Sequence, residues 1–139
     1  MSGKSVSNRF FETYGKQHDV EGCTPLFATD AIIHTTTAGP EPVNFDGYKQ
    51  IGYAFLAGFD DLTVDVLDQF EADDKVVSRV LWSGTHTGTL NGIPPTGRHF
   101  RAETIVIDQV ADGRIKERWE IGDMLGMMQQ LGVIPAPGA

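Results

Sequence analysis

Four stretches in the second half of the chain alternate between apolar and polar residues, and this pattern constrains the fold more than any other feature. Short segments rich in turn-forming residues separate the stretches, among them the run 91–97 and the hairpin 111–113. Successive side chains of a strand point to opposite faces of a sheet, so each stretch predicts one strand. We therefore predict a mostly antiparallel sheet with strands in 62–73, 75–88, 98–110 and 114–123.

The first half has helical spacing instead. Val6, Phe10 and Tyr14 fall on one face of a helix that either Ser5 or Ser7 can cap. A short helix over 20–27 and a β-branched strand over 30–36 are predicted to follow. The apolar positions of a second amphipathic helix are Tyr48, Ile51, Gly52, Phe55 and Phe59.

Helices that precede a run of strands indicate an α+β fold. We expect one domain over 1–139, with a curved, mostly antiparallel sheet and the N-terminal helices on its concave face. This cone-shaped α+β barrel encloses a pocket that suits a small hydrophobic substrate. The residues expected to line it are Tyr14, Phe55, Phe59, Trp82, His86, Glu103 and Trp119.

Composition and charge argue against several classes of protein. A net charge of −8 repels the phosphate backbone, so we expect no nucleic-acid partner. No apolar run reaches the roughly 18 residues that a membrane span needs. Cys23 is the single cysteine and the N-terminus lacks a signal-peptide pattern, which together predict a cytoplasmic protein.

A cofactor or a metal is not expected either. The lysines fall at termini, on helix surfaces or at outward strand positions, so none suits a Schiff base. The four histidines show none of the close spacings of metal ligands. We therefore expect chemistry by side chains alone.

The last predicted strand carries the main catalytic candidate. Alternation puts Glu117, Trp119, Ile121 and Asp123 on one side, which we expect to be the inner one because it is the more apolar. A carboxylate that faces an apolar pocket has a raised pKa, which suits general acid/base catalysis on a carbon acid. The alternative is that Asp123 only caps the helical segment that follows it.

Other polar residues are weaker candidates. His34 lies in the predicted strand 30–36, where a lone histidine often only contacts a polar neighbour. Alternation pairs His86 with Trp82, and we expect that pair to face the pocket. Glu103 offers a second carboxylate, with an ion pair to Arg79 or Arg101 as its alternative. Core packing would explain Phe55 and Phe59 equally well.

Three C-terminal motifs resemble those of the SnoaL-like polyketide cyclases, which have a ketosteroid-isomerase-like cone fold. They are WSGTHTGTLNGIPPTG (82–97), ADGRIKERWEIGD (111–123) and LGMMQQLGVIP (125–135). The resemblance implies a metal-free intramolecular aldol condensation of a polyketide ester, with Asp123 as the acid/base. His34 matches the family more loosely. The chain departs from the family in the third strand, where Ile105 and Ile107 are expected on the inner face.

These observations favour an ester cyclase in which Asp123 moves the proton and His34, with His86 as a further candidate, hydrogen-bonds the developing enolate. An isomerase or an epoxide hydrolase on the same fold is one alternative, and a binding protein without chemistry is another. The strands also carry more apolar positions than one helical layer can cover. We therefore expect a homodimer or a higher homo-oligomer.

Overall fold

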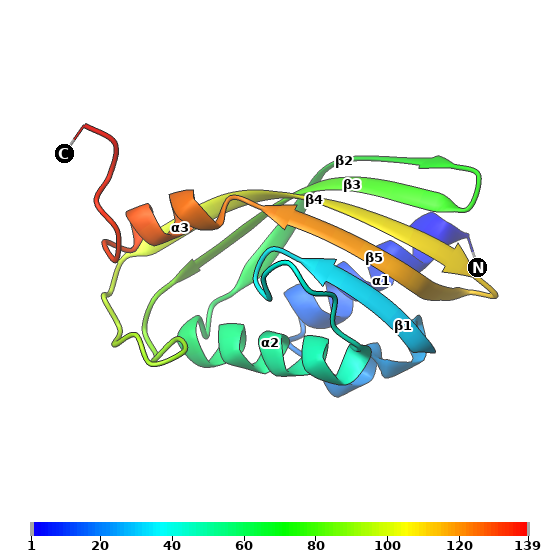
Figure 1. The fold of residues 1–139 in the computed structure, drawn as a ribbon, viewed down its shortest axis with the longest axis horizontal. Helices are drawn as coiled ribbons and strands as arrows, with labels where there is room; N and C mark the ends of the chain where they lie inside the picture. The colour runs from blue at the N-terminus through cyan, green and yellow to red at the C-terminus, as the bar shows by residue number, and fades with distance from the viewer. Residues whose placement is uncertain (1, 139) are drawn as a thin grey trace.

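A computed structural model describes residues 2–138, and Figure 1 shows how its helices and its sheet are arranged. The predicted order of elements is confirmed. The elements are α1 (Gly3–Gly15), the 3-10 helix η1 (Glu21–Leu26), β1 (Phe27–Thr35), α2 (Phe45–Gly58), β2 (Thr63–Ala72), β3 (Lys75–Thr85), β4 (His99–Ala111), β5 (Arg114–Gly122) and α3 (Met124–Gln130).

The five strands form one curved, unclosed sheet in the order β1-β5-β4-β3-β2. Neighbouring strands are antiparallel except for β1, which runs parallel to β5. Helices α1 and α2 lie across the concave side of the sheet, and α3 continues from the end of β5 (Figure 1). This is the mixed α+β fold with a curved, mostly antiparallel sheet that the sequence predicts.

Helix α1 packs its apolar face into the core, as its spacing predicts. Val6, Phe10 and Tyr14 are buried, whereas the predicted N-cap is wrong. Ser2 caps the helix, because its side chain accepts the Ser5 N–H at 3.2 Å. The helix therefore begins earlier than either serine favoured by the sequence.

A β-bulge in β5 reverses the predicted faces of this strand. Gln109 pairs with Glu117 and Val110 pairs with Ile115, so Lys116 is an extra residue without a partner of its own in β4. One extra residue moves every following side chain to the opposite face. Trp119 and Ile121 consequently lie on the outer face, and the expectation that they face the interior is wrong.

The inner face of the sheet also differs from expectation in β4. Ile105 is 40% exposed and pairs with Ile121, and Ile107 pairs with Trp119, so both isoleucines lie on the outer face. Val106 faces inward and is buried. The periodicity of this strand is right, but the face assigned to it is wrong.

None of the helices within residues 2–138 combines the length and apolarity needed to cross a membrane.

Candidate functional site

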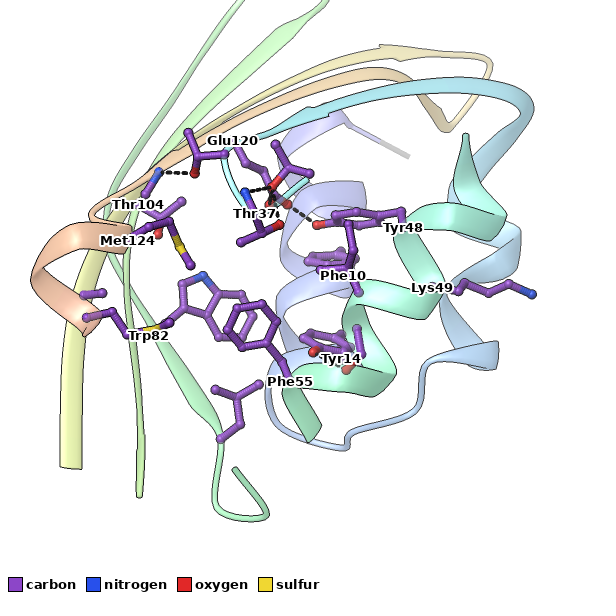
Figure 2. Close-up of a pocket in the computed structure, with 18 of the residues that line it drawn as sticks. Phe10, Tyr14, Thr37, Tyr48, Lys49, Phe55, Trp82, Thr104, Glu120 and Met124 are labelled. Atoms are coloured by element: carbon purple, nitrogen blue, oxygen red, sulfur yellow. Dashed lines mark hydrogen bonds between the residues drawn. The ribbon is translucent and has the colours of Figure 1, made fainter. Parts of the chain in front are cut away.

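A pocket lies between the concave face of the sheet and the helices α1 and α2, as Figure 2 shows. Its walls are mainly aromatic and aliphatic, with polar side chains gathered near the end of β1, the middle of β4 and the end of β5. Such a lining binds an apolar body and orients it with few polar groups. The apolar walls include Phe10, Tyr14, Phe45, Phe55, Leu62, Trp82, Phe100 and Met127, and the polar residues include Thr35, Thr36, Thr37, Tyr48, Thr104, Glu120 and Asp123.

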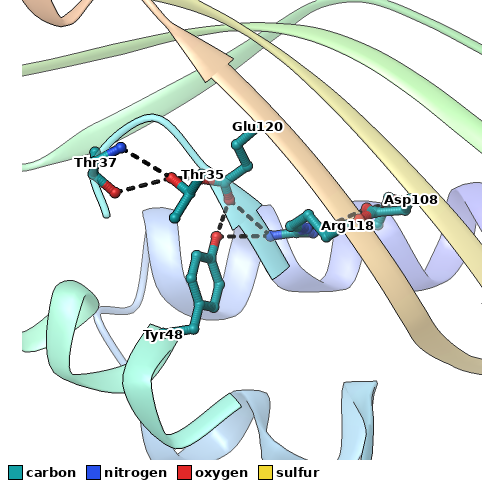
Figure 3. A network of polar contacts seen from close by, with 7 residues as sticks. Thr35, Thr37, Tyr48, Asp108, Arg118 and Glu120 are labelled. Carbon is teal, nitrogen blue, oxygen red and sulfur yellow. Dashed lines mark hydrogen bonds and ion pairs between the residues drawn. The ribbon is translucent and has the colours of Figure 1, made fainter. Parts of the chain in front are cut away.

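Glu120 is the less exposed of the two carboxylates in this lining, with 17% of its side chain accessible. It comes from β5 and, because of the bulge, points inward toward α2 (Figure 3). Its carboxylate accepts hydrogen bonds from the Tyr48 hydroxyl and from Thr35 Oγ1 at 3.2 Å. Burial raises the pKa of Glu120, against the opposing effects of the Arg118 charge and of the Tyr48 hydrogen bond.

Tyr48 reaches Glu120 from the first turns of α2. Asn44 fixes this end of the helix, since its side chain accepts the Gly47 N–H at 2.9 Å. Burial, and then the nearby charge of Glu120, raise the pKa of Tyr48 well above its usual value. Tyr48 therefore stays protonated and acts as a hydrogen-bond donor to the carboxylate.

A buried ion pair lies behind the carboxylate. Arg118 and Asp108 have side chains that are 0% and 1% exposed, and two nitrogen–oxygen contacts of 2.6 and 2.9 Å join them. The Arg118 guanidinium also lies 3.9 Å from the centre of the Phe10 ring. Burial alone would lower the pKa of Arg118, but the charge of Asp108 holds it well above its usual value.

Three of the predicted pocket residues line the pocket. Tyr14, Phe55 and Trp82 belong to its wall (Figure 2). Tyr14 and Trp82 meet edge to face with ring centres 5.8 Å apart. The Tyr14 hydroxyl donates to the Gly52 carbonyl at 2.8 Å, which ties α1 to α2.

His34, Trp119 and Glu103 lie on the outer face, so their predicted place in the pocket is wrong. His34 Nε2 is 2.7 Å from a carboxylate oxygen of Glu117, and its ring stacks on Trp119 at 5.5 Å. Glu103 forms an exposed ion pair with Arg79 at 2.6 Å. The bulge at Lys116 explains Trp119, and strand pairing places His34 beside it.

His86 and Phe59 are core residues and do not line the pocket. Both are completely buried, with ring centres 5.5 Å apart. His86 follows the last residue of β3, and its Nδ1 accepts a hydrogen bond from the Thr96 N–H at 3.3 Å. Backbone pairing with Arg98 continues the alternation past Thr85, but His86 packs on Phe59 and is not part of the pocket wall.

Asp123 occupies the helix-capping position that the sequence left open as its alternative. Its carboxylate accepts the Gly126 N–H at 2.9 Å at the start of α3. The residue is exposed, so the expected enclosure in an apolar site is wrong. Asp123 nevertheless contributes to the pocket lining, and its catalytic role stays a prediction.

The sequence reasoning missed Glu120 and the residues that hold it. Regular pairing across the hairpin 111–113 would place Glu117 opposite Asp108, and only the bulge at Lys116 brings Arg118 there. No local pattern in the sequence therefore indicated the pair of Asp108 and Arg118. Within residues 2–138, no three histidine, cysteine, aspartate or glutamate side chains gather as ligands for a metal ion.

The raised pKa of Glu120 predicts a pH dependence of stability. A carboxyl whose pKa is higher in the folded than in the unfolded protein stabilises the fold fully below its unfolded pKa of about 4.3. That contribution is lost as the pH rises through the pKa of the carboxyl in the folded protein. Glu120→Gln has no titrating carboxyl at this position, so only the wild type loses this stability as the pH rises. The melting temperature of the variant minus that of the wild type should therefore increase between pH 4 and neutrality.

Thermal unfolding of the two proteins across this pH range, monitored by circular dichroism, measures the difference. Glu41→Gln is a suitable control, because Glu41 is exposed and lies in the loop before α2. Its difference from the wild type should stay constant with pH. A constant or decreasing difference for Glu120→Gln would contradict the raised pKa.

Comparison with known proteins gives matches over most of the chain. Residues 5–131 match the family model of the SnoaL-like polyketide cyclases. The chain is 35% identical over 69 residues to the aklanonic acid methyl ester cyclase DnrD of Streptomyces peucetius, which covers 48% of each chain. It is 39% identical over 49 residues to the nogalonic acid methyl ester cyclase of Streptomyces nogalater, which covers 35% of this chain and 37% of that one. The matched segments thus span about half the length of these relatives or less.

Among solved structures, wild-type IdmH of Streptomyces antibioticus, a suggested polyketide cyclase, matches over nearly its whole length. The TM-score is 0.85 at 34% identity, and the match covers 95% of this chain and 99% of that one. A second suggested polyketide cyclase, from Acidithiobacillus ferrooxidans, has a TM-score of 0.80 at 25% identity, with 94% of each chain covered.

Proposed function

Because the chain belongs to the SnoaL-like polyketide cyclase family, we propose that it closes a ring in a polyketide methyl ester by a cofactor-free intramolecular aldol condensation. The methyl esters named for its relatives support this class of substrate. The single observation that carries the proposal is Glu120, a carboxylate of raised pKa at the polar end of an otherwise apolar pocket.

Glu120 acts as the general base. Its carboxylate removes a proton from the carbon next to the ester carbonyl, and the resulting enolate attacks a ketone or aldehyde carbonyl of the same molecule. A carbon–carbon bond forms, the attacked carbonyl becomes an alkoxide, and protonated Glu120 returns the proton to that oxygen. A carboxyl whose pKa is shifted toward neutrality is effective in both directions of this transfer.

The remaining pocket residues bind and orient the ester. Aromatic side chains such as Phe10, Phe55 and Trp82 offer flat apolar walls to a fused ring system. Hydroxyl groups of Thr37 and Thr104 lie at the polar end (Figure 2), where they can hydrogen-bond carbonyl oxygens of the substrate. The apolar walls of the pocket around the substrate exclude water from the enolate.

Asp123 remains a second candidate for the proton transfer. It lies three residues after Glu120 and lines the same pocket, and the family resemblance favours it. Its exposure and its role as the cap of α3 argue for Glu120 instead. The two candidates differ in what their amide variants should lose, since only the variant of the proton-transferring residue should lose turnover.

The test is direct incubation of the purified protein with an aromatic polyketide methyl ester, without added metal or nucleotide. Ring closure by an aldol step conserves mass, so the expected product is an isomer with a new carbon–carbon bond visible by NMR. A shifted double bond in place of a new ring would instead identify an isomerase. Addition of one water to an epoxide substrate would identify an epoxide hydrolase, and tight binding without any product would identify a binding protein.

We also propose that the outer face of the sheet pairs with a second copy of the chain. Strand register places Phe70, Val77, Ile107 and Trp119 in one row across four strands. Beside this row Ile121, near the end of β5, is 67% exposed and adds to the apolar surface. An apolar face of this kind is self-complementary in a symmetric dimer.

Sedimentation at micromolar concentration should therefore give about twice the chain mass of 15.2 kDa. Ile121→Arg places a charge in this face, and it should shift the protein to monomers without unfolding it because the side chain is exposed. Ile134→Arg, at an exposed apolar residue beyond α3, is the matched control and should leave the dimer intact. A wild-type protein that sediments only as a monomer would refute the proposal.

A further inference from the structure

Asp108 is a buried carboxylate that does not line the pocket, yet it is bound to the residue that contacts Glu120. Resting on the proposed function of Glu120, we propose that Asp108 is a positioning residue that offsets the charge of Arg118, so that Glu120 stays basic enough to take a proton from carbon. Asp108 touches neither the substrate space nor the reacting atoms, and it acts only through Arg118.

The contact geometry shows which carboxylate Arg118 is paired with. Its Nε and Nη2 atoms donate to the two oxygens of Asp108 at 2.6 and 2.9 Å. Its contact with Glu120 is a single one, from Nη1, at 3.4 Å. A bidentate pair is much stronger than one long contact, so the positive charge is directed mainly at Asp108.

Neighbouring residues hold the ion pair in this orientation. The Ser7 hydroxyl, from α1, donates to Asp108 at 2.7 Å. The guanidinium lies against the rings of Phe10 and Phe27, at 3.9 and 5.2 Å from their centres. These contacts restrict Arg118, so it cannot turn fully toward Glu120.

The net charge of this buried group explains the effect of Asp108 on Glu120. Arg118 carries one positive charge, whereas Asp108 and ionised Glu120 carry one negative charge each, so the buried group has an excess of one negative charge. Uptake of a proton by Glu120 removes that excess. The proton affinity of Glu120 is therefore higher than it would be beside an arginine without a second carboxylate.

The other groups that face Glu120 do not supply a compensating charge. Thr35 approaches from β1, Tyr48 from α2, and Tyr14 from α1 near Cys23 of η1. Burial raises the pKa of both tyrosines, and it raises the pKa of the Cys23 thiol to about 12. The two tyrosines and the Cys23 thiol are therefore neutral at physiological pH. Arg118 and Asp108 then determine the electrostatic potential at Glu120.

The test is the titration of Glu120 in Asp108→Asn. Asparagine keeps the shape and a hydrogen-bond acceptor for Arg118 but removes the negative charge, so the arginine then acts on Glu120 alone. Carbon-13 NMR of labelled glutamate follows the carboxyl of Glu120, assigned by loss of its signal in Glu120→Gln. We expect the titration midpoint to fall by about one pH unit or more.

The matched control is Asp68→Asn, which removes the same charge from an exposed position on β2. Solvent screens that position, so the Glu120 midpoint should stay where it is in the wild type. An unchanged or higher midpoint in Asp108→Asn would overturn the proposal.

A double variant keeps the proposal testable if Asp108→Asn does not fold. Asp108→Asn with Arg118→Gln replaces the ion pair by two neutral amides, which are less costly to bury than a lone charge. If the two charges offset each other at Glu120, its midpoint should change by less than about one pH unit. A larger rise would mean that Arg118 acts on Glu120 without compensation, which overturns the proposal.

The titration does not depend on turnover, so the two hypotheses can fail separately. A protein that binds esters without converting them, but shows the lowered midpoint, retains the Asp108 effect and loses the proposed function. An active protein with an unchanged midpoint retains the function and loses the role of Asp108. In an active enzyme, the acidic limb of the kcat/KM profile should move to lower pH by the same amount as the midpoint.

Discussion

Glu120→Gln is expected to lower turnover of a polyketide methyl ester by about two to four orders of magnitude, with little change in binding. Glutamine fills the same volume, its amide oxygen can still accept the hydrogen bond of Tyr48, and its amide nitrogen can donate to Thr35 Oγ1 in place of the second bond. It cannot take up a proton, so the step from ester to enolate loses its base. Single-turnover rates and the dissociation constant of the ester, measured on the same preparation, separate chemistry from binding.

Asp123→Asn is the matched control for this result. It removes a carboxylate from the same pocket, at the N-cap of α3. If Asp123 only caps the helix, the variant should keep its activity and nearly all of its unfolding free energy, because asparagine caps a helix about as well as aspartate. The opposite pattern, an inactive Asp123→Asn beside an active Glu120→Gln, would assign the proton transfer to Asp123.

Arg118→Gln should lower the free energy of unfolding by about 3–5 kcal/mol, the largest effect on stability that we expect from a single substitution. The cause is Asp108, which is 1% exposed. Loss of the guanidinium leaves it as a buried carboxylate without an ion-pair partner. Urea unfolding, followed by tryptophan fluorescence, measures the loss.

Two further variants show whether burial causes this loss. Arg79→Gln breaks the exposed pair with Glu103 on the outer face and should cost at most about 1 kcal/mol. Adding Asp108→Asn to Arg118→Gln removes the unpaired charge and should recover much of the stability. If the double variant is as unstable as the sum of both single variants, the two residues are not energetically coupled.

The sequence predicts the order of elements well because local patterns determine it. The alternation after Leu62 and the hairpin 111–113 correspond to β2 through β5, and the spacing of Val6, Phe10 and Tyr14 corresponds to the buried face of α1. Turn chemistry and side-chain periodicity act over a few residues, so they can be read without knowing the tertiary contacts.

The face that each strand turns to the pocket is a tertiary property, and here the sequence reasoning failed. A single extra residue, Lys116, exchanges the two faces of the rest of β5. Trp119 and Ile121 suggest an inner face by their hydrophobicity, whereas they form part of an apolar outer face. The charged residues Arg118 and Glu120 are inside because each has buried partners, and no local pattern records those partners.

The pocket walls were predictable in part for the same reason. Tyr14 and Phe55 belong to helices whose apolar face must point at the sheet, so helical spacing located them correctly. His86 and Phe59 satisfy equally good local patterns but pack against each other in the core, where Phe59 lies behind the wall residues Phe55 and Phe100. Only the packing of β3 against the end of α2 separates these two groups.

The measurement that tests the central claim most directly uses an ester that carries two deuterium atoms on the carbon next to the ester carbonyl. If Glu120 removes one of them and ring closure follows, the product in ordinary water retains one deuterium and is lighter than the substrate by one mass unit. The wild type should form this product, Glu120→Gln should not, and a sample without protein corrects for spontaneous exchange. A cyclised product that keeps both deuterium atoms, or equal conversion by Glu120→Gln, would contradict proton abstraction by Glu120.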